Sequence, residues 1–251
     1  MIAASSPAFS IMDLQDALEY ISRDFEAWEV VGEGYHSLPE IEKEFLELTP
    51  SYELEYSAHS PMSDINIGSL NPRMREASIR ELLEGMGAAS RMGMDIYTIH
   101  PGFMTPIGFV MPDRVKEVTK LSLRRLETTS RDLGITVALE NMPRSPFAMA
   151  TDPDTLKELI EDIEMSICFD IGHANTMGLI DEFLDLKDRF VNIHIHDNMG
   201  ATDEHLPIGK GTVDFPKILD RLIGYTGRYV IESKGIEDAI ESQKELRRLL
   251  L

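Results

Sequence analysis

Histidines and acids gather in one short segment of this sequence. Residues 191–211, VNIHIHDNMGATDEHLPIGKG, hold three of the chain's seven histidines and three of its acids. Imidazoles and carboxylates at such spacing are the side chains that hold a divalent metal ion or move protons during catalysis. The segment begins with an apolar run, so His194 and His196 are predicted to lie at the end of a buried strand.

The elements that must position these residues repeat along the chain. Apolar runs alternate with amphipathic helical patterns, which indicates eight strand-then-helix units. We therefore predict an α/β fold, a single (β/α)₈ TIM barrel, as one domain over residues 1–251. A doubly wound open sheet is the alternative, but its usual glycine-rich turn does not follow the first run. The apolar runs are 2–6, 25–31, 53–59, 95–100, 135–141, 165–171, 190–197 and 228–233, and the helical patterns are 11–23, 38–48, 70–91, 112–133, 152–163, 179–187, 214–224 and 236–250.

Polar residues concentrate where the predicted strands end. In a TIM barrel the catalytic groups lie at the carboxyl ends of the strands, and six of the seven histidines lie at or just past such ends. The seventh, His36, is expected at the surface or the mouth. One histidine at a strand end is more commonly a structural residue, but six together favour a metal site. The residues at these ends are His59, His100, Glu140, Asn141, Asp170, His173, His194, His196 and Glu232, followed by Asp203 and His205 in the loop after the seventh strand.

Strand alternation predicts which of these side chains point into the barrel. In VNIHIHD the isoleucines would face the helices, while His194 and His196 face the interior. The same alternation points Glu140, Asp170 and Glu232 inward. Buried charges without partners are very costly, and a divalent ion would compensate them. Imidazoles and carboxylates without a thiolate suit Zn²⁺, Mn²⁺, Co²⁺ or Fe²⁺ better than Ca²⁺. We expect one to three divalent ions, zinc first, with manganese or cobalt as alternatives.

Six motifs occur in order between about residue 55 and residue 235: IHPG (99–102), LENM (139–142), FDIGHAN (169–175), HIHDN (194–198), DEHLPIGKG (203–211) and IES (231–233). Together they resemble the xylose-isomerase-like barrel superfamily, which includes endonuclease IV and many sugar and sugar-phosphate isomerases and epimerases. In endonuclease IV nine side chains hold three zinc ions, whereas the isomerases typically hold one ion with four. The resemblance implies the metal ligands His59, His100, Glu140, Asp170, His173, His194, Asp203, His205 and Glu232, of which Glu140, Asp170, His194 and Glu232 would hold the single ion of an isomerase.

The resemblance implies two different chemistries. In the first, the ion binds a carbonyl and a neighbouring hydroxyl of a small sugar or sugar phosphate, which is isomerised or epimerised through an enediolate. Glu140 and Glu232 would act as the acid and base, and His173 would be a further catalytic residue that contacts the substrate. The candidate substrate-binding residues are His196, Lys210 and Asn141.

The second chemistry is hydrolysis of DNA at abasic sites, and the complete set of nine ligands is the argument for it. The predicted mouth loops favour the sugar, because 102–113 and 172–178 contain no lysine or arginine to meet phosphates. The loop 60–72 also lacks a large aromatic residue that could wedge into a duplex. Nucleic acid is thus the less expected partner. Another metal-dependent activity, such as a lyase, stays open, while a barrel that only binds is disfavoured because it has no need for both glutamates.

Composition sets the remaining expectations. A formal net charge of −20 repels nucleic-acid phosphates unless a basic patch or bound metal reverses the field. The single cysteine, Cys168, excludes an internal disulfide and fits the cytoplasm. No apolar run is long enough to span a membrane. The apolar loop 102–112 is predicted to be a lid over a small pocket or a homodimer contact, with an ordinary buried loop as the alternative.

Overall fold

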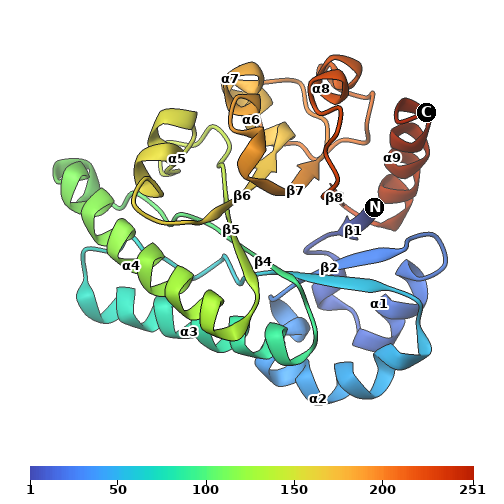
Figure 1. The fold of residues 1–251 in the computed structure, drawn as a ribbon, viewed down its shortest axis with the longest axis horizontal. Coiled ribbons are helices and arrows are strands. Elements are labelled where there is room, and N and C mark those ends of the chain that lie inside the picture. The colour runs from blue at the N-terminus through green and yellow to red at the C-terminus, as the bar shows by residue number, and fades with distance from the viewer.

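Eight short parallel strands pair in sequence order, and β8 returns to β1 to close a barrel (Figure 1). The computed structural model describes all residues from Met1 to Leu251. This architecture confirms the predicted TIM barrel, and each predicted apolar run contains one strand. The strands are β1 (Ile2–Ser5), β2 (Ala27–Val31), β3 (Glu55–His59), β4 (Ile96–Ile99), β5 (Thr136–Glu140), β6 (Ser166–Asp170), β7 (Phe190–Ile195) and β8 (Arg228–Glu232).

Helices form the outer layer around the strands (Figure 1). Four of them begin at side chains that accept backbone N–H groups of the first turn: Asn71, Asp152, Asp170 and Asp214. Helix α4 ends at Gly134, whose φ of 69° lies in the left-handed region that favours glycine. The helices are α1 (Leu14–Ile21), α2 (Leu38–Leu48), α3 (Pro72–Arg91), α4 (Pro112–Leu133), α5 (Pro153–Leu159), α6 (Ile171–Met177), α7 (Ile180–Leu184), α8 (Phe215–Arg221) and α9 (Ile236–Leu249).

Helix α6 covers residues 172–177 of the segment 172–178, which is predicted to be a mouth loop, and corrects that prediction. The carboxylate of Asp170 accepts the backbone N–H of His173 and caps the first turn. Strand β6 therefore stops at Asp170, and Ile171 begins the helix instead of continuing the strand. The correction matters for the site, because it places His173 on a helical turn directly after the strand end.

Apolar side chains form part of the barrel interior beneath its polar mouth. Two clusters of three residues each lie there, separate from the main core of 55 residues between the strands and the helices. The interior is thus packed with side chains, as in other TIM barrels. The two clusters are Ala3, Ala27 and Val230, and Ile96, Ala138 and Cys168.

The amino-terminal end of the barrel carries an ion-pair group. Arg228 Nη1 lies 3.0 Å from Asp95 Oδ1, and Nη2 lies 3.5 Å from Glu55 Oε2. Strand alternation points Glu55 inward, and this arginine is its partner. Because the group lies at the end of the strands opposite the predicted site, these acids belong to the scaffold.

His36 is buried, which corrects its predicted place at the surface or the mouth. Its side chain packs edge-on against the ring of Trp28, with 5.6 Å between the ring centroids. Its Nε2 lies 3.1 Å from the carbonyl oxygen of Met12. Burial lowers the pKa of His36, so this histidine serves as a neutral core residue.

The apolar loop 102–112 exposes large side chains instead of burying them. Ile107, Phe109, Val110 and Met111 are between 46% and 74% exposed, so the alternative of an ordinary buried loop is wrong for this part. Phe109 packs beside Phe147, with ring centroids 5.9 Å apart.

None of the helices has the length and apolar character needed to cross a bilayer.

Candidate metal centre

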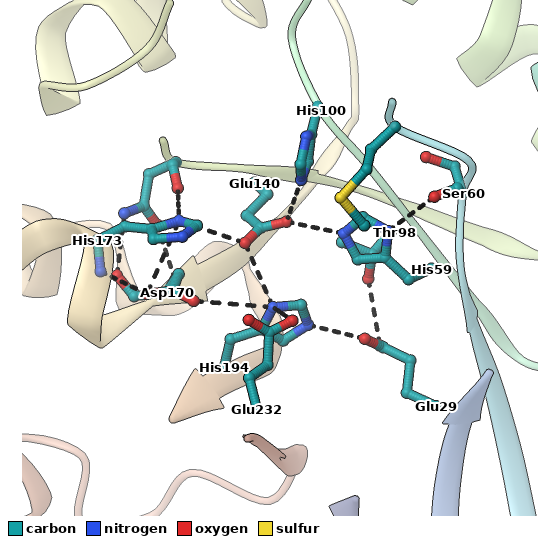
Figure 2. A network of polar contacts seen from close by, with 12 residues as sticks. Glu29, His59, Ser60, Thr98, His100, Glu140, Asp170, His173, His194 and Glu232 are labelled. Atoms are coloured by element: carbon teal, nitrogen blue, oxygen red, sulfur yellow. Dashed lines mark hydrogen bonds and ion pairs between the residues drawn. The ribbon is translucent and has the colours of Figure 1, made fainter. Parts of the chain in front are cut away.

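Four imidazoles meet around one carboxylate, that of Glu140 at the end of β5 (Figure 2). Glu140 Oε2 lies 3.1 Å from His59 Nε2 and 3.1 Å from His100 Nε2. Its Oε1 lies 3.3 Å from His194 Nδ1 and 3.4 Å from His173 Nδ1. The glutamate side chain is 1% exposed. Imidazoles from three strand ends and from α6 thus take the place of water around one carboxylate.

An inner group consists of Glu140, Asp170, His194 and Glu232, from the ends of β5, β6, β7 and β8. One potential ligand atom from each lies within 4.8 Å of the others. His194 Nδ1 lies 3.1 Å from Glu232 Oε1 and 3.9 Å from Asp170 Oδ2. Only Glu232 among them reaches solvent appreciably, with 13% of its side chain exposed. The inward orientation predicted by strand alternation therefore brings all four side chains to one point.

An outer group consists of His173, His196, Asp203 and His205, whose ligand atoms also lie within 4.8 Å of one another. Asp203 Oδ2 lies 3.2 Å from His173 Nε2 and 3.1 Å from His205 Nε2. The rings of His196 and His205 stack with 4.0 Å between centroids. His205 has a φ of 47°, a costly conformation for a residue other than glycine, which the surrounding loop must enforce.

The loop that carries Asp203 and His205 is anchored by the buried carboxylate of Asp197. Its carboxylate accepts the backbone N–H groups of Asn198, Gly209, Gly211 and Val213 at 2.8–3.1 Å. A Cβ on Gly211 would lie 2.3 Å from Asp197 Oδ1, so this close approach requires glycine. Asp197 thus ties both ends of the loop to the end of β7.

Backbone carbonyls fix the orientation of two of the imidazoles. His59 Nδ1 donates to the carbonyl oxygen of Ser60 at 2.8 Å, and His173 Nδ1 donates to that of Asn141 at 2.8 Å. In each ring the hydrogen on Nδ1 is used in this way, which leaves Nε2 facing a carboxylate, that of Glu140 for His59 and that of Asp203 for His173. Orientation of this kind is typical of histidines that bind metal.

The charges of the centre perturb one another strongly. Burial would lower the pKa of His173, but the carboxylates of Asp170 and Asp203 and that of Glu140 raise it to about 10. Burial would raise the pKa of Glu140, but the imidazoles, His194 first, hold it well below its usual range. Without a metal the centre therefore pairs imidazolium with carboxylate, and a cation can replace those protons.

Residues 18–249 match the family of xylose isomerase-like TIM barrels. The chain belongs to this family. A relative within it, the uncharacterized protein MJ1311 of Methanocaldococcus jannaschii, is 35% identical over 257 residues, covering 98% of this chain and 88% of the relative. The resemblance found in the sequence motifs is thereby confirmed.

Solved structures with the same fold include one of an epimerase-like protein and others of sugar epimerases. The structure of a D-tagatose 3-epimerase-like protein is 34% identical, with a TM-score of 0.93, and the match covers 100% of this chain and 97% of that chain. A probable endonuclease 4 of Thermoplasma acidophilum is a more distant relative, 25% identical over 167 residues that cover 60% of this chain and 56% of the relative. More distant structures under 25% identical, which show the shared fold alone, include an L-ribulose 3-epimerase and a Thermus thermophilus protein soaked with zinc chloride.

Two buried residues lie beside the centre but are not among the site residues predicted from the sequence. Cys168 is fully buried beside Glu140 and His194. Burial raises the pKa of its thiol well above the usual range, so the group is neutral. Glu29 of β2 is fully buried beneath His194. Alternation could have found both, since Cys168 precedes Asp170 by two residues and Glu29 is the only charge in the strand AWEVV.

The residues of the centre fit a divalent metal ion. Buried atoms without a hydrogen-bond partner converge there, among them His194 Nδ1, Asp170 Oδ2 and His196 Nε2, and such atoms call for a ligand. Many ligand atoms lie 3.1–3.3 Å apart, close to the edge of about 3.3 Å of a tetrahedron with metal bonds of roughly 2.0–2.1 Å. The donors, imidazole and carboxylate with one thiol nearby, suit zinc, manganese or cobalt.

The three candidate substrate-binding residues lie in different surroundings. His196 is fully buried beneath His205. Both polar atoms of the Asn141 amide bond to the backbone of Asp170, at 2.9 and 2.8 Å. Lys210 is exposed, and its ammonium lies 2.9 Å from Glu241 of α9. Substrate contacts by these residues stay predictions, and each would require the residue to leave or share a partner that it already has.

Proposed function

We propose that this protein is a divalent-metal-dependent isomerase or epimerase of a small sugar or sugar phosphate, with Glu140 and Glu232 as its acid and base. The observation that carries the proposal is the inner group, in which three carboxylates surround Nδ1 of one imidazole at the mouth of the barrel. The epimerase-like structure that matches the entire chain supports it.

The inner group supplies the parts that proton transfer beside a carbonyl requires. A bound divalent ion would polarise the carbonyl and the neighbouring hydroxyl of the sugar. Glu232, the most solvent-accessible of the four, would remove the proton from the adjacent carbon. Glu140, which contacts the same nitrogen of His194 as Glu232 does, would take up a proton from solvent and give it to the resulting enediolate. His173 lies next to Glu140 and would hold a sugar hydroxyl.

Isotope exchange tests this proposal. Wild-type protein loaded with zinc, manganese or cobalt is incubated in D₂O with a panel of ketoses, aldoses and their phosphates, and deuterium at the carbon beside the carbonyl is measured by mass spectrometry. Exchange should occur with at least one sugar, and Glu232→Gln should abolish it. Full exchange by Glu232→Gln on the same sugar would refute the two-glutamate mechanism.

A specific observation favours a second function, endonuclease-like hydrolysis at abasic sites. Glu140 belongs both to the inner group and to a group with His59 and His100, and the outer group adds a third cluster, so three ions could bind side by side. Against it, cations at the mouth are already engaged: Arg144 donates to the carbonyl oxygen of Thr176 at 2.7 Å, and Lys210 pairs with Glu241. We therefore rank this function second.

Counting metal separates the two functions. Elemental mass spectrometry of protein purified without chelator gives the number of ions per chain, and the same sample is tested on a duplex with one abasic site. One or two ions without nicking support the isomerase. Close to three zinc ions with nicking that a chelator abolishes would establish the nuclease instead.

The exposed apolar loop 102–112 is proposed to cover the site, either as a lid or as a homodimer contact. Its side chains Ile107, Phe109 and Val110 are at least half exposed, and a lid would keep water from an enediolate. Light scattering on wild-type protein and on Phe109→Ser decides between the two. A dimer that the substitution dissociates supports the contact, and a monomer in both cases supports the lid.

A further inference from the structure

A carboxylate that belongs to neither metal group lies directly beneath the inner group. Glu29 of β2 is fully buried, and its Oε1 lies 3.0 Å from Nε2 of His194 (Figure 2). This oxygen has no other polar partner, and its alignment with the imidazole falls short of a full hydrogen bond. A buried carboxylate oxygen that faces one nitrogen needs an explanation, because such groups are costly unless they are used.

The neighbours of Glu29 decide which nitrogen of His194 carries the hydrogen. The Asn192 amide nitrogen lies 3.2 Å from Glu29 Oε2 and 3.1 Å from Thr98 Oγ1, and these two acceptors use both of its hydrogens. No hydrogen is left for His194 Nε2, which lies 3.4 Å away. Nε2 must therefore donate, and the acceptor in front of it is Glu29. When a metal replaces the proton on Nδ1, the lone pair of that nitrogen points to where Glu140, Asp170 and Glu232 converge.

His194 differs in this respect from two other imidazoles of the centre. His59 and His173 donate to backbone carbonyls, which are neutral acceptors. His194 alone among these three faces a charged acceptor on its far side. A carboxylate fixes the tautomer as a carbonyl does, and it also makes the imidazole a stronger electron-pair donor to a metal.

We propose that Glu29 is a positioning residue that fixes the Nε2–H tautomer of His194 and strengthens its Nδ1 as a metal ligand. The proposal rests on the proposed metal-dependent function of the inner group. Glu29 itself is not a ligand, because it contacts the imidazole on the side away from the other carboxylates. Thr98 and Asn192 hold it there through its second oxygen.

The test compares Glu29→Ala, which removes the acceptor, with Glu29→Gln, which keeps an oxygen but removes the charge. The matched control is Glu127→Gln, a buried carboxylate of α4 whose partner is Arg131, outside the barrel interior. Zinc affinity is measured by competition with a chromophoric chelator. The tautomer of His194 is read from imidazole ¹⁵N chemical shifts, and thermal unfolding of each metal-free variant checks its fold.

We expect Glu29→Ala to lower the affinity for the tightest-bound zinc ion by about 10- to 100-fold, the range typical of lost outer partners of a metal ligand. Glu29→Gln should lower it less, and Glu127→Gln by less than about 2-fold, since it touches no metal ligand. In the zinc-bound wild-type protein, His194 should carry its remaining proton on Nε2. Affinity and tautomer unchanged in Glu29→Ala would overturn the proposal. If that variant does not fold, Glu29→Gln with wild-type affinity and tautomer would overturn it as well.

The design separates this inference from the proposed function. Wild-type protein that binds no zinc would refute the metal-dependent function and this inference with it. Wild-type protein that binds zinc, with unchanged binding in both Glu29 variants, would refute only the role of Glu29. Tight zinc binding without turnover of any sugar would refute the isomerase, while the affinity and tautomer data would still decide the role of Glu29.

Discussion

The inner and outer groups use the same kinds of side chain but are held in different ways. The inner group comes from four neighbouring strands whose hydrogen-bonded register fixes Asp170 opposite His194. The outer group takes Asp203 and His205 from a loop, where a carboxylate anchor and a strained backbone hold them. Strands position ligands more rigidly than a loop does. The inner group is therefore the part of the site suited to precise proton transfer, and the outer group is the adjustable part.

Proton competition should separate the two groups most clearly. In the outer group His173 and His205 have pKa values raised to about 10 and about 8, so below pH 8 both are protonated in the metal-free protein. A metal must displace both protons, and each displaced proton lowers the apparent metal affinity about tenfold for each unit by which the pH falls. Lowering the pH from 8 to 6 should weaken metal binding by the outer group by roughly 10⁴-fold. The inner group should lose only about 100-fold, because His194 is its only residue that must give up a proton.

Zinc titrations at pH 6, 7 and 8, read by competition with a chelator, measure this difference. The tighter class of sites should persist at pH 6 while the weaker class is lost. Equal slopes for both classes would show that the two groups bind as one unit and would remove the distinction drawn between them.

Glu140 belongs to the inner group and also contacts His173 of the outer group. Replacing it should therefore impair both groups. Glu140→Gln leaves the four surrounding imidazoles without their shared negative charge. Turnover of the true substrate should fall by about 10³-fold, within the range for loss of an acid–base group, and bound metal per chain should drop. Steady-state kinetics and elemental analysis measure both. Near-normal turnover with full metal content would show that Glu140 only bridges ligands and moves no proton.

His205 tests the outer group alone. His205→Ala removes one outer ligand and the stacking on His196, and it leaves alanine in the same left-handed backbone. An isomerase that works at the inner group should lose less than about 10-fold in kcat, since no acid–base group is removed. A loss comparable to that of Glu140→Gln would mean that both groups take part in one reaction, as hydrolysis across several ions requires.

The sequence predicts the inner group well and the rest of the site less well, for physical reasons. Strands have a period of two residues, so alternation alone points His194, Asp170 and Glu232 inward. The positions of Asp203 and His205 come only from the family resemblance, because no local pattern tells where a loop folds.

The errors have equally local causes. The carboxylate of Asp170 caps a helix in the segment 172–178, where a loop is expected. Residue type alone does not distinguish an aspartate that binds metal from one that caps a helix. His36 is surrounded by residues distant in sequence, so its burial leaves no periodic signal. Glu29 is inward by the same alternation as its neighbours, yet a lone acid in an apolar strand is easily taken for an edge residue.

The smallest expected effect concerns the rim of the site, where Lys210 follows the outer loop. Its ammonium pairs with Glu241, and both side chains are more than half exposed, so the pair contributes little to stability. Lys210→Ala should change kcat and KM by less than about 2-fold for an uncharged sugar, because neither group of the centre contacts this lysine. A several-fold rise in KM that is confined to a phosphorylated sugar would show that Lys210 leaves Glu241 to bind the phosphate. That result would extend the adjustable part of the site beyond the outer group and make phosphate part of the substrate.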